Sequence, residues 1–400
     1  MGNIKPLKNH AVYISEKISS HILSVTNYIT TDNILQNKQG KIAATSLPAK
    51  VGKVTKYSAC DILVANIRPY LKKIWFANDS GGCSADVLTF RAKTDTHPKF
   101  LYYALFRDDF FSHVMKGSKG TKMPRGDKNQ IMEFFIPPFD LSTQEKVADV
   151  LSALDAKIEL NNIINAELEA LAKTLYDYWF VQFDFPNANG EPYKTSCGKM
   201  TYSTTLKRKI PKGWVCGTLL DIATFTNGLA CQKFRPKNEQ YYRVIKIREM
   251  GAGFTDGSEL VTVNIPEKVI VNNGDVLFSW SATLDVKIWT GGKGALNQHI
   301  FKITSKKYPK SYYYFQLLNY LQHFKMIAEL RKTTMGHITQ EHLQQSVITI
   351  PPIDLINQLD EAIKPVLEKK VKLEEENLHL TQLRDWLLPM LMNGQIRVEN

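Results

Sequence analysis

A six-residue motif occurs twice in this chain of 400 residues. Residues 136–141, with the sequence Ile-Pro-Pro-Phe-Asp-Leu, return 214 positions later at 350–355 as Ile-Pro-Pro-Ile-Asp-Leu. A second match has the same spacing, because Asp61-Ile62-Leu63 corresponds to Asp275-Val276-Leu277. A period this long far exceeds that of solenoid repeats and is typical of two duplicated domains. The sequence therefore predicts one module present twice.

The composition predicts two ordinary globular cores, since 44% of the residues are apolar. No CxxC or His-Cys spacing joins the cysteines, which argues against both a disulfide framework and a zinc site. The N-terminus lacks the apolar core of a signal peptide, and no apolar run is long enough to span a membrane. We expect a soluble, cytoplasmic protein with no membrane partner. The five cysteines are Cys60, Cys83, Cys197, Cys216 and Cys231.

Each copy shows short β-branched and aromatic runs separated by turn residues, which indicates a mixed α/β domain. A proline-led aromatic segment follows in both copies, from Pro98 and from Pro309, and predicts a helix with buried aromatic side chains. The glycine doublets at 81–82 and 291–292 predict hairpin turns. The fold class we expect is α+β, with two similar mixed α/β domains.

A long helix with a heptad pattern is predicted after each Pro-Pro motif. Polar residues such as Asn161 and Asn165 in the first seam, and Lys370, Asn377 and Arg384 in the second, interrupt the apolar positions. Such residues lower stability and restrict register. The residues predicted to pair the two helices are Leu151, Leu154, Ile158, Leu168, Leu175, Leu359, Val366, Leu373, Leu380 and Leu387.

The path of the chain favours an antiparallel coiled coil between these two helices. The first helix segment, 142–182, is helical to about residue 180 and leads away from the first domain over roughly 58 Å at ~1.5 Å per residue, and the second must lead back. We therefore expect a pseudo-twofold duplication with domain one at 1–141, a linker at 183–210, domain two at 211–353, and the second helix and tail at 354–400. Pairing of each helix with another chain is the alternative.

Catalytic motifs are missing from this sequence. It contains no P-loop and no GxGxxG, and its nine histidines lack the HExxH spacing of a zinc site. The Pro-Pro-aromatic motif of amino-methyltransferases requires a preceding Asn or Asp, and here that residue is Ile136. Because the formal net charge is +12, polyanions are the first partner class to consider.

Basic and polar loops recur at equivalent places in the two copies. The residues that flank these loops repeat between the copies, while the side chains within the loops differ. Two domains that recognise different base sequences would require this arrangement. In the first copy the candidate DNA-binding residues are Asn66, Arg68, Tyr70, Lys72, Lys73, Lys119, Thr121, Lys122 and Arg125. In the second copy they are Lys233, Ser279, Trp280, Ser281, Thr283, Lys293, Asn297, Gln298, Arg331, Lys332, Thr333, Thr334 and His337.

Nearly the whole chain resembles the specificity subunit of a type I restriction–modification system. The resemblance is carried by the duplicated domains, the aromatic bridge 176–185, the Ile-Pro-Lys-Gly-Trp segment 210–214, and the ending 387–398. It implies two target recognition domains that each bind half of an asymmetric bipartite site in double-stranded DNA. It also implies that the helices set the spacer and dock the partner subunits.

The resemblance assigns all catalysis to partners, namely two modification (methyltransferase) subunits and the restriction subunits. S-adenosylmethionine, ATP and Mg are expected in those partners, and no cofactor or metal is expected in this chain. Three alternatives stay open: a single-chain methyltransferase or nuclease, a coiled-coil adaptor without a DNA role, and a specificity subunit of a related type II system.

Overall fold

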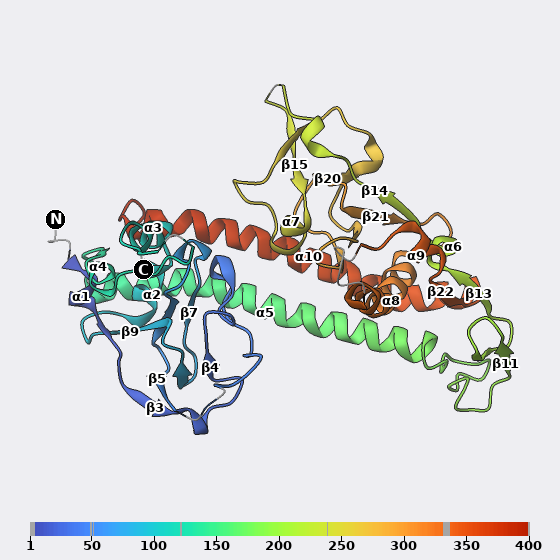
Figure 1. Ribbon diagram of the computed structural model, residues 1–400, viewed down its shortest axis with the longest axis horizontal. Helices are drawn as coiled ribbons and strands as arrows, with labels where there is room; N and C mark the ends of the chain where they lie inside the picture. The colour runs from blue at the N-terminus through green and yellow to red at the C-terminus, as the bar shows by residue number, and fades with distance from the viewer. Residues whose placement is uncertain are drawn as a thin grey trace. The chain divides into compact units, whose positions relative to one another are not determined.

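The computed structural model describes residues 5–48, 50, 52–120, 122–237, 239–330 and 337–398. Two compact units make up the chain (Figure 1). The first comprises Met1–Ile158 with Leu380–Asn400, and the second comprises Glu159–His379. Each unit therefore holds one mixed domain together with part of each long helix. Within the described residues, no helix is both long enough and apolar enough to span a membrane.

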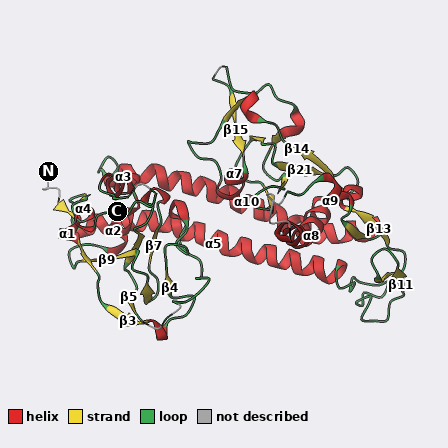
Figure 2. Ribbon diagram, in the orientation of Figure 1, coloured by secondary structure: helices red, strands yellow, loops and turns green. Residues whose placement is uncertain are grey.

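The first domain begins and ends with one antiparallel strand pair, β1 with β10. Short helices and short strands make up this domain (Figure 2). The elements are β1 (Lys5–Pro6), α1 (Leu7–His10), β2 (Ala11–Tyr13), β3 (Lys17–Ser19), β4 (Tyr28–Ile29), β5 (Lys53–Tyr57), β6 (Ile62–Ala65), β7 (Ile74–Phe76), β8 (Gly81–Cys83), β9 (Val87–Ala92), α2 (Pro98–Phe106), α3 (Asp108–Lys116), α4 (Lys128–Ile131) and β10 (Phe135–Ile136).

The second domain is closed in the same way by β13 and β22, which are antiparallel. A hairpin, β11 with β12, precedes it. The elements are β11 (Met200–Ser203), β12 (Arg208–Pro211), β13 (Val215–Thr218), α6 (Leu219–Ile222), β14 (Thr224–Asn227), β15 (Tyr241–Ile245), α7 (Ile247–Ala252), β16 (Leu260–Thr262), β17 (Ile270–Val271), β18 (Val276–Ser279), β19 (Asp285–Ile288), β20 (Gly294–Leu296), β21 (Ile300–Thr304), α8 (Lys310–Leu330), α9 (Gln340–Gln344) and β22 (Val347–Ile350).

One four-stranded antiparallel sheet is the same in both domains. Its strand order is β2-β9-β6-β7 in the first and β14-β21-β18-β19 in the second. The central strands β6 and β18 are buried along their whole length, so their sequences Ile-Leu-Val-Ala and Val-Leu-Phe-Ser are apolar at nearly every position. This sheet forms the common framework of the duplication.

The repeated aspartate caps the turn that leads into the central strand of this sheet. The Asp61 carboxylate accepts the Ser58 N–H at 2.8 Å, and the Asp275 carboxylate accepts the Asn272 N–H at the same distance. The residue before each aspartate has a left-handed backbone, with φ of 70° at Cys60 and 86° at Gly274. The second sequence match therefore marks one conserved turn.

A second sheet differs between the domains at its edge. In both domains a parallel pair, β4 with β8 or β15 with β20, is extended by an antiparallel strand, β5 or β17. The fourth strand then joins opposite sides, because β3 pairs with β5 whereas β16 pairs with β15. The two domains therefore differ in which edge of the second sheet the fourth strand extends.

The hairpin turns predicted at the glycine doublets are wrong. Gly81 and Gly82 lie inside β8, where a Cβ on Gly81 would stand 2.1 Å from the Asn27 carbonyl oxygen. Gly291 and Gly292 connect β19 to β20, which belong to different sheets. Close backbone approach, rather than a turn between paired strands, explains the first doublet.

The two long helices are α5 (Leu141–Phe180) and α10 (Ile353–Met392), each of 40 residues. In the second unit, Asn161 donates to Asn377 at 2.9 Å and Lys370 lies 3.4 Å from Glu169. From the first contact to the second, the residue number rises on α5 and falls on α10, so the two helices are antiparallel. This direction and the α+β class confirm the sequence prediction.

The apolar residues predicted to pair the helices are all buried or half-buried. Several of them also pack on the domains, however. Leu151 and Leu387 contact the first-domain core, whereas Leu175, Leu359 and Val366 contact the second-domain core. The seam therefore holds each domain against the helices in addition to any packing of one helix on the other.

The segment predicted as a linker, 183–210, is largely structured. Its hairpin β11–β12 pairs Met200 with Pro211, and Phe185 stacks on Trp214 with ring centroids 5.5 Å apart. Most of the basic run at 207–214 lies in or next to β12. Aromatic packing near the end of α5 explains this order.

Candidate nucleic-acid interface

The end of the central strand is built alike in both domains. The Asn66 carbonyl, just beyond β6, accepts the Gly126 N–H at 3.3 Å. The Trp280 carbonyl, just beyond β18, accepts the Ile338 N–H at 2.9 Å. Residues 66 and 280 are 214 positions apart, the spacing of the repeat, so the same backbone hydrogen bond occurs in both domains. Different side chains stand on the same backbone.

A short helix follows this hydrogen bond in each domain. Asp127 caps α4, and its carboxylate accepts the backbone N–H groups of Asn129 and Gln130 at 2.9 and 3.2 Å. These N–H groups lower the pKa of Asp127. Thr339 is the equivalent residue before α9, and its N–H donates to His342 Nδ1 at 3.0 Å. The caps fix where the following side chains point.

Cationic side chains project from two touching loops in the first domain. Lys119 and Arg125 exchange two backbone hydrogen bonds of 3.0 Å, and the Arg68 N–H donates to the Pro124 carbonyl at 2.8 Å. Arg68 itself has a φ of 52°. Because Arg68, Lys119, Lys122 and Arg125 are all exposed, their charges lie on one surface of the first domain.

Two acids partly balance this surface. Arg125 lies 3.0 Å from Asp86, and Lys119 lies 3.8 Å from Asp127, with 87% of the Lys119 side chain exposed. Exposed pairs of this kind are weak and readily exchanged for another anion. The surface can therefore bind a polyanion without losing a strong internal interaction.

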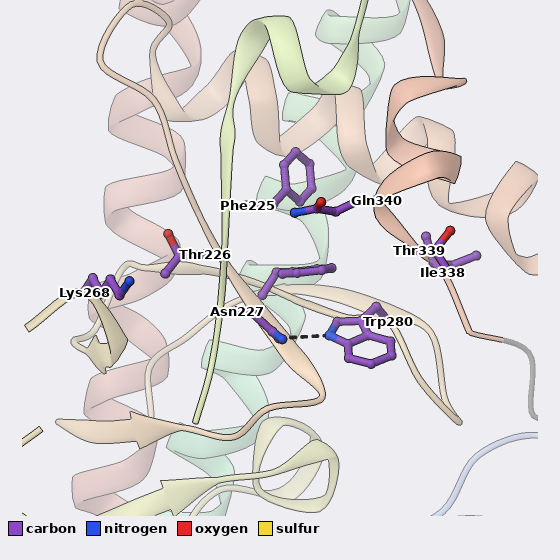
Figure 3. Close-up of a pocket in the computed structure, with 9 residues that line it drawn as sticks. Phe225, Thr226, Asn227, Lys268, Trp280, Ile338, Thr339 and Gln340 are labelled. Carbon is purple, nitrogen blue, oxygen red and sulfur yellow. Dashed lines mark hydrogen bonds between the residues drawn. The ribbon is translucent and has the colours of Figure 1, made fainter. Parts of the chain in front are cut away.

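The second domain has a cavity of about 530 Å³ at the corresponding place (Figure 3). Strands β14 and β21, together with Trp280 just beyond β18, supply one wall, and the segment from Ile338 into α9 supplies the other. Its lining combines aromatic, amide and hydroxyl side chains with one cation. The residues are Phe225, Thr226, Asn227, Lys268, Trp280, Phe301, Ile338, Thr339 and Gln340.

Trp280 is held in place on several sides. Its ring centroid lies 5.5 Å from those of His299 and His337 and 5.9 Å from that of Phe301. Its indole N–H donates to Asn227 Oδ1 at 3.3 Å, as the dashed line in Figure 3 shows. An aromatic face fixed in this way suits a planar ligand.

Comparison with known proteins places this architecture in a family. The family described as "Type I restriction modification DNA specificity domain" matches residues 24–170 and 211–379. The two matches follow the duplication, since each covers one domain and part of the helix that follows it. The chain belongs to the type I specificity-subunit family.

Relatives and a solved structure agree with this assignment. The chain is 27% identical over 316 residues to the type I restriction enzyme MjaIX specificity subunit of Methanocaldococcus jannaschii, a match that covers 75% of this chain and 69% of that protein. It is 24% identical to the HindI specificity subunit of Haemophilus influenzae, covering 92% and 94%. The crystal structure of a type I S subunit from M. genitalium shares the fold, with a TM-score of 0.57, 14% identity, and coverage of 98% and 97%.

Two lysines predicted to bind DNA in this specificity subunit are half-buried and have partners within the first domain. Lys72 lies 2.9 Å from Asp108, which also pairs with Lys38 at 2.7 Å. Lys73 donates to the Thr31 carbonyl, and burial lowers its pKa. Both lysines contact partners within their own domain, so their ammonium groups are less available to DNA than those of the exposed cations. Asn66 is buried, with 9% of the residue exposed, so its side chain is not accessible to DNA. Tyr70 is 51% exposed and stays a candidate.

Three polar residues predicted in the second domain are also buried. The Ser279 hydroxyl donates to the Thr283 carbonyl at 2.5 Å and accepts the Asp285 N–H at 3.0 Å. Ser281 and Asn297 are each only 6% exposed. These side chains are buried inside the loops, where they are not accessible to DNA.

The other predicted residues of the second domain are accessible or outside the described chain. Lys233, Thr283 and Lys293 are exposed, and Gln298 is half-buried with its amide 3.2 Å from His299. His337 lies beside Trp280, as described above. Thr121, Arg331, Lys332, Thr333 and Thr334 lie outside the described residues.

Sequence reasoning missed several residues around the cavity, above all Asn227 and Gln340. In the first domain, the ammonium of Lys128 lies 4.6 Å from the Tyr13 ring and donates to its hydroxyl at 2.9 Å. An internal alignment extended from Asn66 and Trp280 to the segments that meet them would have pointed to these positions. Among the described residues, no group of three or more His, Cys, Asp or Glu is placed to hold a metal.

Proposed function

We propose that this specificity subunit recognises an asymmetric bipartite site in double-stranded DNA, with one half bound by each domain. The observation that carries the proposal is the equivalent backbone hydrogen bond accepted by the Asn66 carbonyl in the first domain and by the Trp280 carbonyl in the second. Identical framing with different side chains is what two domains need to recognise unlike sequences in a similar way. In this proposal, the chain itself catalyses nothing.

Phosphate contacts would supply most of the affinity of the first domain. Arg68, Lys119, Lys122 and Arg125 are exposed cations on the two touching loops. Each phosphate that such a group neutralises releases counterions, which makes binding strongly salt-dependent. Base contacts would then discriminate sequences, at about 1–3 kcal/mol for each good bidentate contact.

The long helices would set the spacing between half-sites and dock the partner subunits. Exposed apolar residues of α5 in the second unit support docking, with Leu160 51%, Ile163 52% and Leu171 60% exposed. Isolated apolar residues on a surface need no explanation, but three along one helix favour an interaction site. The partners we propose are two modification subunits and the restriction subunits.

All chemistry would lie in those partners. Modification subunits would bring S-adenosylmethionine, and restriction subunits would bring ATP and Mg. Because the amino group of adenine is inaccessible within a base stack, methylation would require the base to be flipped out of the duplex. The specificity subunit would position the duplex for that step.

A domain exchange tests the proposal. Residues 211–350, which contain β13 to β22, would be replaced by the same segment of a relative, and the methylated sequence would be mapped in cells that also express the modification subunits. We expect one half-site to change while the other half stays the same. A change in both halves, or in neither, would contradict the proposal.

A further inference from the structure

The position beside Trp280 in the second domain is built differently from the matching position of the first domain. There, Lys128 extends over Tyr13 and bonds its hydroxyl at 2.9 Å. Lys128 directly follows the capping residue Asp127, just as Gln340 directly follows Thr339. The second domain therefore offers an amide and a cavity at the position where the first domain carries a cation folded onto a tyrosine.

The amide of Asn227 is oriented by the indole. Because the Trp280 N–H donates to Asn227 Oδ1 at 3.3 Å, the Nδ2 group is left to donate elsewhere. Tryptophan N–H is a donor only, so the opposite orientation of this amide would place two donors against each other. The cavity thus has a donor whose identity is set by a neighbouring ring.

Gln340 supplies the second amide. It is exposed at the start of α9 and faces the cavity from the wall opposite the strands (Figure 3). A glutamine amide can donate and accept at once, which matches the N6 and N7 atoms on the major-groove edge of adenine. The apolar atoms of Trp280 and Ile338 beside it suit the methyl group of the paired thymine.

Lys268 adds a positive charge to the same lining. A cation beside a site for a base edge is positioned to contact the phosphate backbone of the same DNA segment. The cavity therefore combines a base-specific amide, an apolar wall and a phosphate-binding cation, all within the second unit.

We propose that this cavity is a base-recognition subsite that accepts one A·T pair of the second half-site. Gln340 binds the adenine edge in bidentate fashion, Trp280 forms the apolar wall, and Asn227 donates to an acceptor of the same or the adjacent pair. This assignment rests on the proposed function, because it names the base pair that the second domain recognises at one position.

The test uses the full complex with modification subunits and maps methylated sites across a genome. In the Gln340→Ala variant, the preference for A·T at one position of the second half-site should fall by about 10- to 100-fold, the value of one bidentate contact. In the Gln340→Glu variant, the preferred pair at that position should become C·G, since a carboxylate accepts from the cytosine amino group.

Gln344→Glu is the matched control, because it makes the same change at the far end of α9 and Gln344 does not line the cavity. Trp280→Phe keeps a ring but removes the N–H that orients Asn227, and a thermal melt shows whether the variant is folded. We expect folded Trp280→Phe to relax the same position and no other.

The outcomes separate this inference from the proposed function. If the wild-type complex methylates no defined sequence, the proposed function fails. If the wild-type complex is sequence-specific but Gln340→Glu and Gln340→Ala leave the second half-site unchanged, only the cavity assignment is overturned. A change confined to the first half-site would also overturn it.

Discussion

Arg384 on α10 donates to Asp155 on α5 at 2.8 Å, and the same carboxylate accepts the Tyr103 hydroxyl at 2.6 Å. The second unit has a matching set, in which Glu169 of α5 lies 3.4 Å from Lys370 of α10 and accepts the Tyr314 hydroxyl at 2.9 Å. In both sets the acid stands on α5 and the base on α10. Each domain is thereby tied to both helices.

Charge reversal at Arg384 should destabilise the first unit. Burial by itself would lower the pKa of Arg384, but Asp155 and Asp385 outweigh it and raise that pKa. The Arg384→Glu variant places a third acid here and should cost about 2–4 kcal/mol of unfolding free energy, given that the arginine is largely buried. Denaturant unfolding measures the loss.

The double variant Asp155→Arg with Arg384→Glu should regain part of that loss, because the pair is restored while the acceptor of Tyr103 is not. Lys8→Glu is the control, since its pair with Glu133 is about half exposed on both sides. It should change stability by about 0.5 kcal/mol or less. Equal effects at Lys8 and Arg384 would show that burial does not decide the result.

The buried contact between Asn161 and Asn377 should specify how the helices align. Asn161 is fully buried and donates to Asn377 and to Glu376, each at 2.9 Å. Either asparagine changed alone to Leu should lower the unfolding free energy by about 1–2 kcal/mol, because its partner loses a hydrogen bond. The double Leu variant should recover most of it or exceed the wild type. A double-mutant cycle without positive coupling would contradict this prediction.

Removing a phosphate-binding cation should reduce the salt dependence of DNA binding. For the full complex, Lys119→Ala or Arg125→Ala should each lower the slope of log affinity against log salt by about one. The control is Lys72→Ala, whose side chain is engaged by Asp108. Titrations at several salt concentrations provide the slopes, and an equal reduction in the control would place Lys72 back in the interface.

Four of the five cysteines should fall into two reactivity classes, with the half-buried Cys216 between them. Cys60 and Cys197 are exposed, whereas burial raises the pKa of Cys83 to about 11 and that of Cys231 to about 11. Reactive cysteines need thiolate character and access. Alkylation of the native chain should therefore modify Cys60 and Cys197 and spare the buried pair until the chain unfolds.

The buried thiols of Cys83 and Cys231 predict a dependence of stability on pH. Their ordinary pKa is 9.0, so an unfolded thiol loses its proton before a folded one does. The contribution of the buried thiols to the free energy of unfolding is fully present below pH 9 and is lost as the pH rises through 11. Unfolding midpoints of Cys83→Ala should fall less over this range than those of the wild type.

Repeats and periodicity were sufficient to predict the duplicated α+β fold and the antiparallel helices. The match at Asp61 and Asp275 located one turn in both domains, since a capping carboxylate and a left-handed residue are local requirements. The glycine doublet at 81–82 misled the prediction, because close approach to another segment and a tight turn both favour glycine. Local sequence does not distinguish the two causes.

The candidate interface was only partly predictable for a related reason. Lys72 and Lys119 are both lysines in basic loops, yet 87% of the Lys119 side chain is exposed and only 35% of that of Lys72, because Asp108 on α3 reaches Lys72. Ser279 and Trp280 are adjacent, yet the serine bonds within its own loop and the tryptophan lines a cavity. Composition cannot reveal which side chain finds a partner from a distant segment.

The repeated Pro-Pro motif by itself determined that one module occurs twice with a long helix after each copy, since spacing, helix periodicity and capping are properties of the chain alone. Only the tertiary structure decided that Asn66 and Trp280 occupy one backbone frame and that Gln340 meets Trp280 across a cavity. Those relationships depend on hydrogen bonds and packing between segments far apart in sequence, which form only when the sheet and the loops are assembled.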